Sequence, residues 1–243
     1  MRNFIAISTV LFTRNYFYMP VSELLKSPFV HGNHYHLVFK SIDGLLLFRQ
    51  DADYQTFLKR FAQFTGFVMD TWAYCLLNNH AHFIIKIKSI EAIITNIKQR
   101  ELPKQTVAMK KILATPDEQD VFDEMVERQV NSFMVSYANY TKNKYQHHGG
   151  LFQKPFKRIQ IDSDVHLQVA IIYTHANPVK HKVFNDYLFF PYSSYALFLV
   201  RTSHYCAVEE VLIFFGGVEK FILLHKEQIE HYYQNGFPNS KLE

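Results

Sequence analysis

Two histidines, His80 and His82, stand one residue apart in the stretch NNHAHFIIKI, at the head of a run rich in strand-forming residues. A strand points alternate side chains to the same face, so both imidazoles should leave the predicted sheet together. Neutral imidazoles bind divalent first-row metal ions, and oxygen or amide ligands can complete the shell. The spacing therefore indicates a metal site, and the alternative is a pair of solvated histidines on an exposed strand face.

A second pair with the same spacing, His34 and His36, also enters a predicted strand. Spacing alone does not choose between the two pairs. We favour His80 and His82 because only they are followed by an uninterrupted apolar run, residues 83–85, which would anchor the strand in a core.

A tyrosine and an amide could complete such a site. Tyr173 and Asn177 lie four residues apart in a predicted helix, so their side chains share one helix face. A phenol is a poor nucleophile at neutral pH until a metal ion or a base activates it, and a divalent ion also neutralises charge on an attacked phosphate. This combination is suited to phosphoryl transfer. The alternative is that Tyr173 packs in the core, as most tyrosines in such helices do.

The pattern of apolar residues predicts the elements that must position these side chains. Asn78 and Asn79 should form a tight turn, because asparagine tolerates positive φ. The helix that carries Tyr173 should stop at Asn177, because Pro178 follows. The predicted strands span residues 33–42, 68–77, 79–88 and 157–161, and the predicted helices span 51–64, 116–145, 163–177, 208–215 and 218–231. Residues 89–116 give mixed helical and loop signals.

This order of elements predicts an α+β fold. We expect a sheet with helices packed on one side, close to the ferredoxin-like split βαβ pattern, followed by C-terminal helices. We divide the chain into an N-terminal extension (1–30), a main domain (31–195) and a helical tail (196–243). Met19 is an alternative start of the functional chain.

Composition excludes several classes of protein. With 243 residues and 48% hydrophobic content the chain can build a full core. Its two cysteines, Cys75 and Cys206, match no zinc-finger or disulfide pattern and indicate free thiols in a reducing compartment. The net charge of +4 permits a polyanionic partner. The N-terminal apolar run (4–12) lacks a signal-peptide cleavage site, and no segment is long enough to span a bilayer. We therefore expect a cytoplasmic protein without a membrane partner.

Four separated stretches, taken together, resemble a known family. They are AYCLLNNHAHFIIKIK, GGLFQKPFKR, IIYTHANPVKHKV and YSSY, in this order. They resemble the signatures of the single-tyrosine HUH transposases, in particular of the proteins related to the REP-associated tyrosine transposases. The resemblance covers about residues 32–195 and extends into the tail to about residue 226. It implies an antiparallel sheet flanked by helices, in agreement with the order of elements above.

The resemblance also implies a set of functional residues. The metal-binding histidines of the family fall on His80 and His82, and its nucleophilic tyrosine falls on Tyr173. An amide one helical turn later, here Asn177, helps to hold the metal in relatives. Members cut single-stranded DNA near hairpins with Mg²⁺ or Mn²⁺, leaving a 5′-phosphotyrosine link and a free 3′-hydroxyl. Some are dimers whose tyrosine helix serves the partner's site, and others act as monomers.

The chain departs from the family pattern at several places. The residue between the two histidines is only the small Ala81, and the N-terminal extension has no counterpart. Relatives usually have Met-Pro where this chain has Leu77-Asn78, which alters the turn but not the ligands. Asn177 is shorter than the glutamine of some relatives, which weakens the expectation that it binds the metal.

The resemblance also suggests a role in DNA binding for a basic stretch of the chain. No acidic residue occurs between residues 129 and 161, and Lys154, Lys157 and Arg158 in that interval could contact DNA phosphates. Phe152 or Phe156 could stack on a base. We therefore expect a metal-dependent single-stranded DNA endonuclease and strand transferase, or alternatively a domesticated DNA-binding protein without cleavage activity.

Overall fold

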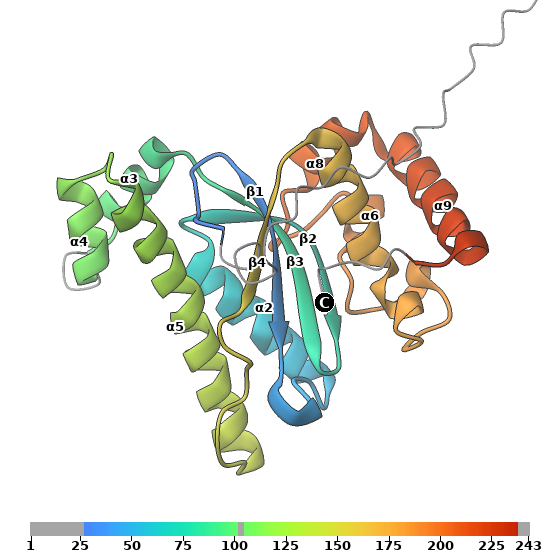
Figure 1. The fold of residues 1–243 in the computed structure, drawn as a ribbon, viewed down its shortest axis with the longest axis horizontal. Helices are drawn as coiled ribbons and strands as arrows, with labels where there is room; N and C mark the ends of the chain where they lie inside the picture. Colours follow the sequence, from blue (N-terminus) through green and yellow to red (C-terminus); the bar gives the residue numbers. More distant parts are fainter. Residues whose placement is uncertain (1–26, 102–104, 238–243) are drawn as a thin grey trace, which may run out of the picture.

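The computed structural model describes residues 27–101 and 105–237. Most of the predicted N-terminal extension, including the alternative start at Met19, lies outside the described residues. Four strands form one sheet in the order β2-β3-β1-β4, and every neighbouring pair is antiparallel (Figure 1). The strands are β1 (His34–Lys40), β2 (Met69–Leu77), β3 (His80–Ile87) and β4 (Lys157–Ile161). The predicted α+β class and ferredoxin-like sheet are confirmed.

The helices of the described residues occur between and after these strands. They are α2 (Asp51–Thr65), α3 (Ile90–Lys98), α4 (Val107–Ala114), α5 (Gln119–Tyr145), α6 (Asp164–Lys180), α7 (Tyr195–Val200), α8 (Val208–Phe215) and α9 (Val218–Asn235), with short 3₁₀ turns η1 (Ile42–Gly44) and η3 (Tyr187–Phe189). The sequence predicted α8 at the observed bounds. Residues 89–116, where α3 and α4 lie, carry only mixed helical and loop signals in the sequence.

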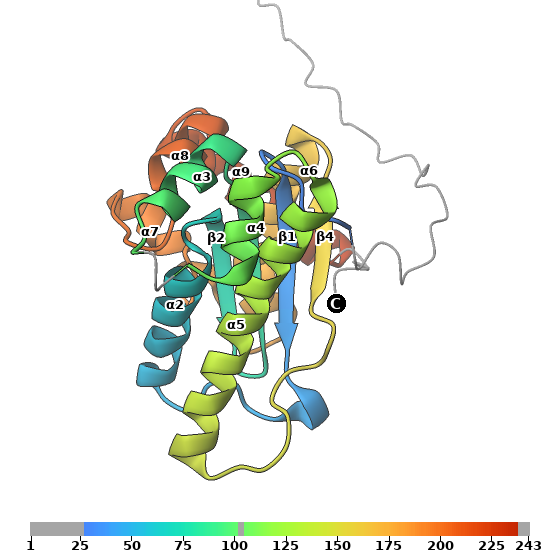
Figure 2. The ribbon, with the colours of Figure 1, turned by 90° about the vertical axis from the view of Figure 1, so that its left-hand side faces the viewer.

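Helices cover both faces of the sheet, whereas we expected them on one side (Figure 1). α2 and α5 pack on one face, against alternate side chains that include Leu37 and Phe83, and Figure 2 shows α5 running along the length of the sheet. α6 packs on the opposite face against β2 and β3, together with the tail helices. Because His80 and His82 alternate with Phe83 along β3, both imidazoles point to the α6 face.

The hairpin between β2 and β3 fixes the start of the histidine strand. Leu77 faces His80 in the antiparallel register, so Asn78 and Asn79 form the predicted two-residue turn, although neither has the positive φ on which the prediction rested. The carbonyl oxygen of Asn78 accepts hydrogen bonds from the amides of Leu47 (2.7 Å) and Phe48 (3.3 Å). The loop after η1 therefore holds the turn from outside the sheet.

The tail is continuous with the main domain. The predicted division after residue 195 falls at the start of α7, and Tyr195 and Phe198 of this helix share one core with residues of α6, α8 and α9. No helix in the described part of the chain combines the length and the apolar character that crossing a membrane requires.

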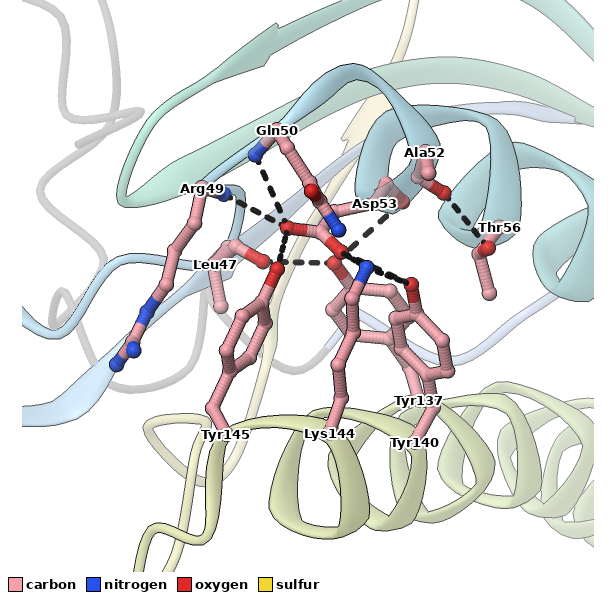
Figure 3. A network of polar contacts seen from close by, with 10 residues as sticks. All are labelled: Leu47, Arg49, Gln50, Ala52, Asp53, Thr56, Tyr137, Tyr140, Lys144 and Tyr145. Carbon is pink, nitrogen blue, oxygen red and sulfur yellow. Dashed lines mark hydrogen bonds and ion pairs between the residues drawn. The ribbon is translucent and has the colours of Figure 1, made fainter.

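A buried carboxylate joins α2 to the end of α5 (Figure 3). The Asp53 side chain is fully buried. Burial opposes its ionisation, but the hydrogen bonds around it outweigh burial and lower the pKa of Asp53 to about 2. Its donors are the amides of Arg49 (2.8 Å) and Gln50 (3.2 Å) and the side chains of Tyr140 (2.9 Å), Lys144 (2.7 Å) and Tyr145 (2.6 Å).

Asp53→Ala is expected to lower the free energy of unfolding by about 3–5 kcal/mol, because it leaves buried donors and a charged partner without their acceptor. Urea denaturation at neutral pH measures the change. Glu124→Ala is the control, because its ion pair with Arg128 lies on the surface of α5. A loss for Asp53→Ala no larger than that for Glu124→Ala would show that the network contributes little.

Candidate metal centre and tyrosine site

Three imidazoles meet where the β2–β3 hairpin lies beside the end of α6. His80, His82 and His181 each offer a ring nitrogen, and these nitrogens lie within 4.8 Å of one another. The ring centroids of His80 and His82 are 5.0 Å apart, and those of His80 and His181 are 4.6 Å apart. The predicted pair is thus brought together with a third histidine, His181, which is not among the site residues predicted from the sequence.

The His80 ring is oriented by the residue before it. Its Nδ1 lies 2.7 Å from the side-chain oxygen of Asn79. A carbonyl oxygen only accepts, so Nδ1 of the neutral ring carries the proton and donates. The other ring nitrogen, Nε2, then carries the lone pair that a metal ion needs.

The His82 ring is fully buried in the sheet. Burial lowers its pKa well below the usual value, and the nearby groups His36, His80, His181 and Lys180 act in the same direction. The ring is therefore neutral, the form in which histidine binds metals. Its Nε2 atom is buried and has no hydrogen-bond partner among the described residues. A buried polar atom of this kind, beside two further imidazoles, suits a metal ion.

Helix α6 does not stop at Asn177 as predicted but continues through Pro178 to Lys180. Pro178 has no N–H, so the carbonyl of Thr174 loses the donor that a regular helix provides. The Asn177 side chain replaces it, with Nδ2 at 3.3 Å from the Thr174 oxygen and 2.9 Å from the Tyr173 oxygen. The extra turn brings Lys180 and His181 to the site.

Tyr173 and Lys180 are in direct contact. The Lys180 ammonium donates a hydrogen bond to the Tyr173 hydroxyl and lies 4.8 Å from the centre of its ring. Tyr173 is buried. Lys180 directly precedes His181, so the same segment of the chain contributes to the contact with the phenol and to the imidazole cluster. We had assigned no role to Lys180.

The two polar atoms of the Asn177 side chain differ in their surroundings. Its Nδ2 bonds to the backbone, as described, and its Oδ1 is buried without a hydrogen-bond partner among the described residues. Its part as a ligand stays a prediction. His181 follows four residues later, one helical turn along the same side of the chain, and its amide donates to the Asn177 carbonyl at 2.9 Å. That spacing was the sequence signal for His181, and the predicted helix end at Asn177 concealed it.

Among known proteins, matches to this chain are found among solved structures. No protein-family model matches the chain, and no curated protein matches it in sequence. Among solved structures, the chain is similar to a REP-associated tyrosine transposase bound to a REP hairpin. The alignment has 14% sequence identity and a TM-score of 0.45, and it covers 71% of this chain and 82% of that chain.

The predicted DNA-contacting residues differ in their surroundings. Arg158 is buried, with its guanidinium 2.9 Å from Asp123 and 3.4 Å from Glu127. Lys154 is exposed and Lys157 is half-buried. The structure thus leaves Lys154 the most accessible of the three, and the DNA contacts stay a prediction.

The predicted stacking on Phe152 or Phe156 is not supported. Both rings are buried, and both pack near Phe39 in the core under α5. A base cannot reach them without opening that core. Exposed phenylalanines occur instead after α6, at Phe184 and Phe189.

A chain of buried polar groups fastens α6 to the tail. His175 lies 2.8 Å from Ser194 Oγ through Nε2 and 2.8 Å from His225 Nε2 through Nδ1, and His225 Nδ1 lies 2.8 Å from the Phe221 carbonyl. The carbonyl accepts, so His225 donates to it, His175 donates to His225, and the serine hydroxyl donates to His175. Both rings are neutral in this arrangement.

Acidification is expected to destabilise the protein through these two histidines. Burial lowers the pKa of His175 well below the usual value and that of His225 to about 3, so the unfolded chain binds more protons below pH 6.5. Stability is therefore complete above that pH and falls as the pH decreases. Each ring contributes up to about 2 kcal/mol to the loss between pH 7 and pH 5.

Urea midpoints measured at pH 7 and pH 5 check this expectation. His204→Gln removes an exposed histidine and should leave the decrease unchanged. Equal midpoints at the two pH values would contradict the neutral, buried arrangement of the pair.

Proposed function

We propose that the protein is a metal-dependent single-stranded DNA endonuclease and strand transferase that acts through a tyrosine–DNA intermediate. The observation that supports this proposal is the cluster of three imidazoles from the hairpin and the end of α6, the helix that also carries a tyrosine whose hydroxyl contacts Lys180. The motif resemblance supplies the substrate class, DNA near a hairpin.

His80, His82 and His181 would hold the metal ion, with the Asn177 oxygen as a further candidate. The buried His82 ring is neutral, and His82 Nε2 and Asn177 Oδ1 have no hydrogen-bond partner among the described residues. A donor set rich in nitrogen favours Mn²⁺ over Mg²⁺, which prefers oxygen ligands. When bound, the ion supplies Lewis-acid stabilisation of charge on the scissile phosphate.

Tyr173 is the proposed nucleophile. Its phenolic oxygen forms a bond to phosphorus while the bond from phosphorus to the 3′-oxygen breaks. The phenol proton leaves and the 3′-oxygen gains a proton, so the exchange of one ester for another needs no further reactant. The phosphate stays on the tyrosine as a 5′ link, from which a later 3′-hydroxyl can form a new junction.

Lys180 is proposed to stabilise negative charge on the attacking phenolic oxygen. Its ammonium already donates to that oxygen, and its charge is strongest in effect where water is excluded. Because Tyr173 is buried under this side chain, the flexible lysine must shift as the DNA phosphate approaches.

Lys180→Met is expected to slow adduct formation by about 100-fold, since removal of one charge-stabilising donor typically has an effect of this size. Lys180→Arg keeps the charge and should retain more of the rate. Single-turnover adduct formation measures both variants, and Lys182→Met serves as control because Lys182 is exposed. Equal rates for Lys180→Met and the unmodified protein would exclude the role.

One chain is sufficient for the proposed site. α6 packs on β2 and β3 of its own sheet, and His181 lies against His80 of the same chain. We therefore propose that Tyr173 serves the site of its own chain, so that a homodimer, which the family resemblance left open, is not required for the chemistry.

The test of the proposed function is covalent trapping. A hairpin oligonucleotide with a single-stranded flank and a 3′ label is incubated with protein and Mn²⁺ or Mg²⁺, then resolved under denaturing conditions. The proposal expects a labelled band at the mass of protein plus DNA, which is absent with chelator. Binding without a metal-dependent adduct or cleavage would instead favour the DNA-binding protein without activity. Cleavage without an adduct would favour a water nucleophile.

A further inference from the structure

His36, which belongs to the second histidine pair on β1, contacts the proposed metal ligand His82 but has no part in the proposed reaction. His36 on β1 and His82 on β3 are both buried, and His36 Nε2 lies 3.0 Å from His82 Nδ1. Their ring centroids are 5.1 Å apart. The nitrogen of His82 that faces His36 is the one opposite its unpartnered Nε2.

The register of the sheet explains the contact. Val38 lies directly opposite His82 in the antiparallel β1–β3 pair, and His36 lies opposite Ile84. His36 and His82 are therefore diagonal neighbours on one face, close enough for long side chains to meet. His34, two residues earlier on β1, packs on Trp72 with ring centroids 4.3 Å apart.

A single proton distinguishes two arrangements of the pair. A neutral imidazole carries one N–H, so either His82 donates from Nδ1 to His36 Nε2, or His36 donates from Nε2 to His82 Nδ1. In the first arrangement His82 Nε2 has a free lone pair and can bind a metal ion. In the second, His82 Nε2 carries a hydrogen and cannot bind.

The surroundings of His82 favour the first arrangement. The two outer nitrogens of the pair, His36 Nδ1 and His82 Nε2, do not distinguish the arrangements by themselves, because each arrangement places a hydrogen on one of these two buried atoms. The space around His82 Nε2 does distinguish them. The neighbouring His80 and His181 present their rings to the same small space, where another hydrogen is poorly accommodated.

We infer that His36 is a positioning residue for His82: its Nε2 accepts the Nδ1 hydrogen of His82 and so directs the lone pair of His82 Nε2 to the metal site. The inference deepens the proposed function and rests on His82 being a ligand. Metal-binding histidines commonly donate their second N–H to a fixed acceptor, and loss of that acceptor typically costs about 10–100-fold in metal affinity. Here the acceptor is a second imidazole.

Three variants test the inference through Mn²⁺ affinity, measured by titration calorimetry on the full chain. His36→Leu fills the space but cannot accept, and its affinity should fall by about 10–100-fold. His36→Gln places an amide oxygen near the position of Nε2, and its affinity should stay within about threefold of the unmodified protein. His34→Leu, the matched control from the same strand and face, should bind as the unmodified protein does.

The order of the two His36 variants separates positioning from packing. If His36 only fills space, His36→Leu should keep a higher Mn²⁺ affinity than His36→Gln. If His36 accepts a hydrogen bond, His36→Gln should keep the higher affinity. Unchanged affinity in His36→Leu, or an equal loss in His36→Gln and His36→Leu, would overturn the inference while leaving the proposed nuclease function intact.

A measurement on the unmodified protein keeps the test independent of how the variants fold. Long-range ¹H–¹⁵N spectra of the metal-free protein, with the His82 signals assigned from their loss in His82→Gln, report which ring nitrogen carries hydrogen. A hydrogen on Nδ1 supports the inference, and one on Nε2 overturns it. If the unmodified protein binds no Mn²⁺, the proposed function fails and the spectrum still decides the arrangement of the pair.

Discussion

Tyr173→Phe is expected to abolish the covalent protein–DNA adduct, with a loss of more than about 1,000-fold, because the variant has no oxygen to attack phosphorus. The ring stays in place, so the fold and the affinity for DNA should be nearly unchanged. Denaturing electrophoresis with a 3′-labelled hairpin substrate measures the adduct, and a filter or gel-shift assay measures binding.

Tyr232→Phe provides the control for this prediction. Tyr232 is also a buried tyrosine in the core shared by α6 and the tail, and its loss should leave adduct formation as it was. An adduct formed by Tyr173→Phe at the normal rate would show that another residue is the nucleophile. Hydrolysis retained without an adduct would instead indicate attack by water.

His82→Ala is expected to remove metal-dependent cleavage, also by more than about 1,000-fold, because it deletes a central ligand and with it the charge stabilisation at the phosphate. Mn²⁺ affinity measured by calorimetry should fall in parallel with activity. Restoration of full activity in this variant by ordinary Mn²⁺ concentrations would contradict the placement of the metal on His82.

The same pair of measurements distinguishes the candidate third ligands. The imidazole cluster leads us to expect a larger loss for His181→Ala than for Asn177→Ala, with His148→Ala, an exposed histidine, as control. The opposite order would return the third position to Asn177, as the family resemblance implies. The Asn177 variant also loses the hydrogen bonds that compensate for Pro178, so its thermal stability must be measured alongside.

Local patterns were sufficient for much of the fold. Alternating residues and the Asn78-Asn79 turn predict the hairpin, and its register places His80 and His82 on one face as expected. The end of α6 was not predictable in this way. The rule that proline ends a helix is a local rule, and here a side chain one residue away supplies the missing hydrogen bond.

The site could be predicted only where its residues are neighbours in sequence. His80 and His82 are two residues apart, and Tyr173 and Asn177 are one helical turn apart. The contacts of His36 with His82, and of His181 with His80, depend on sheet register and on helix placement, which join positions 46 and 101 residues apart. A single sequence carries no local signal for contacts of that kind.

Charge patterning was equally ambiguous for Arg158. An arginine in a run without acidic residues is typical of a residue that contacts phosphate. The hydrogen-bond partner of Arg158, however, is Asp123 on α5, 35 residues earlier in the chain. Its guanidinium also lies 4.5 Å from the ring centre of Phe29. A basic stretch therefore identifies candidates for DNA contact, and the acidic residues of neighbouring elements decide which of them are available.

The histidine relay from Ser194 through His175 to His225 has a consequence for how this protein can diverge or be engineered. Helix α6, which carries the proposed nucleophile, is hydrogen-bonded through His175 to His225 of α9, more than forty positions further along the chain. Exchange of the carboxy-terminal segment for that of another homologue would leave a polar ring facing an apolar surface unless the matching imidazole came with it. The two segments should therefore be inherited, or transplanted, as one unit.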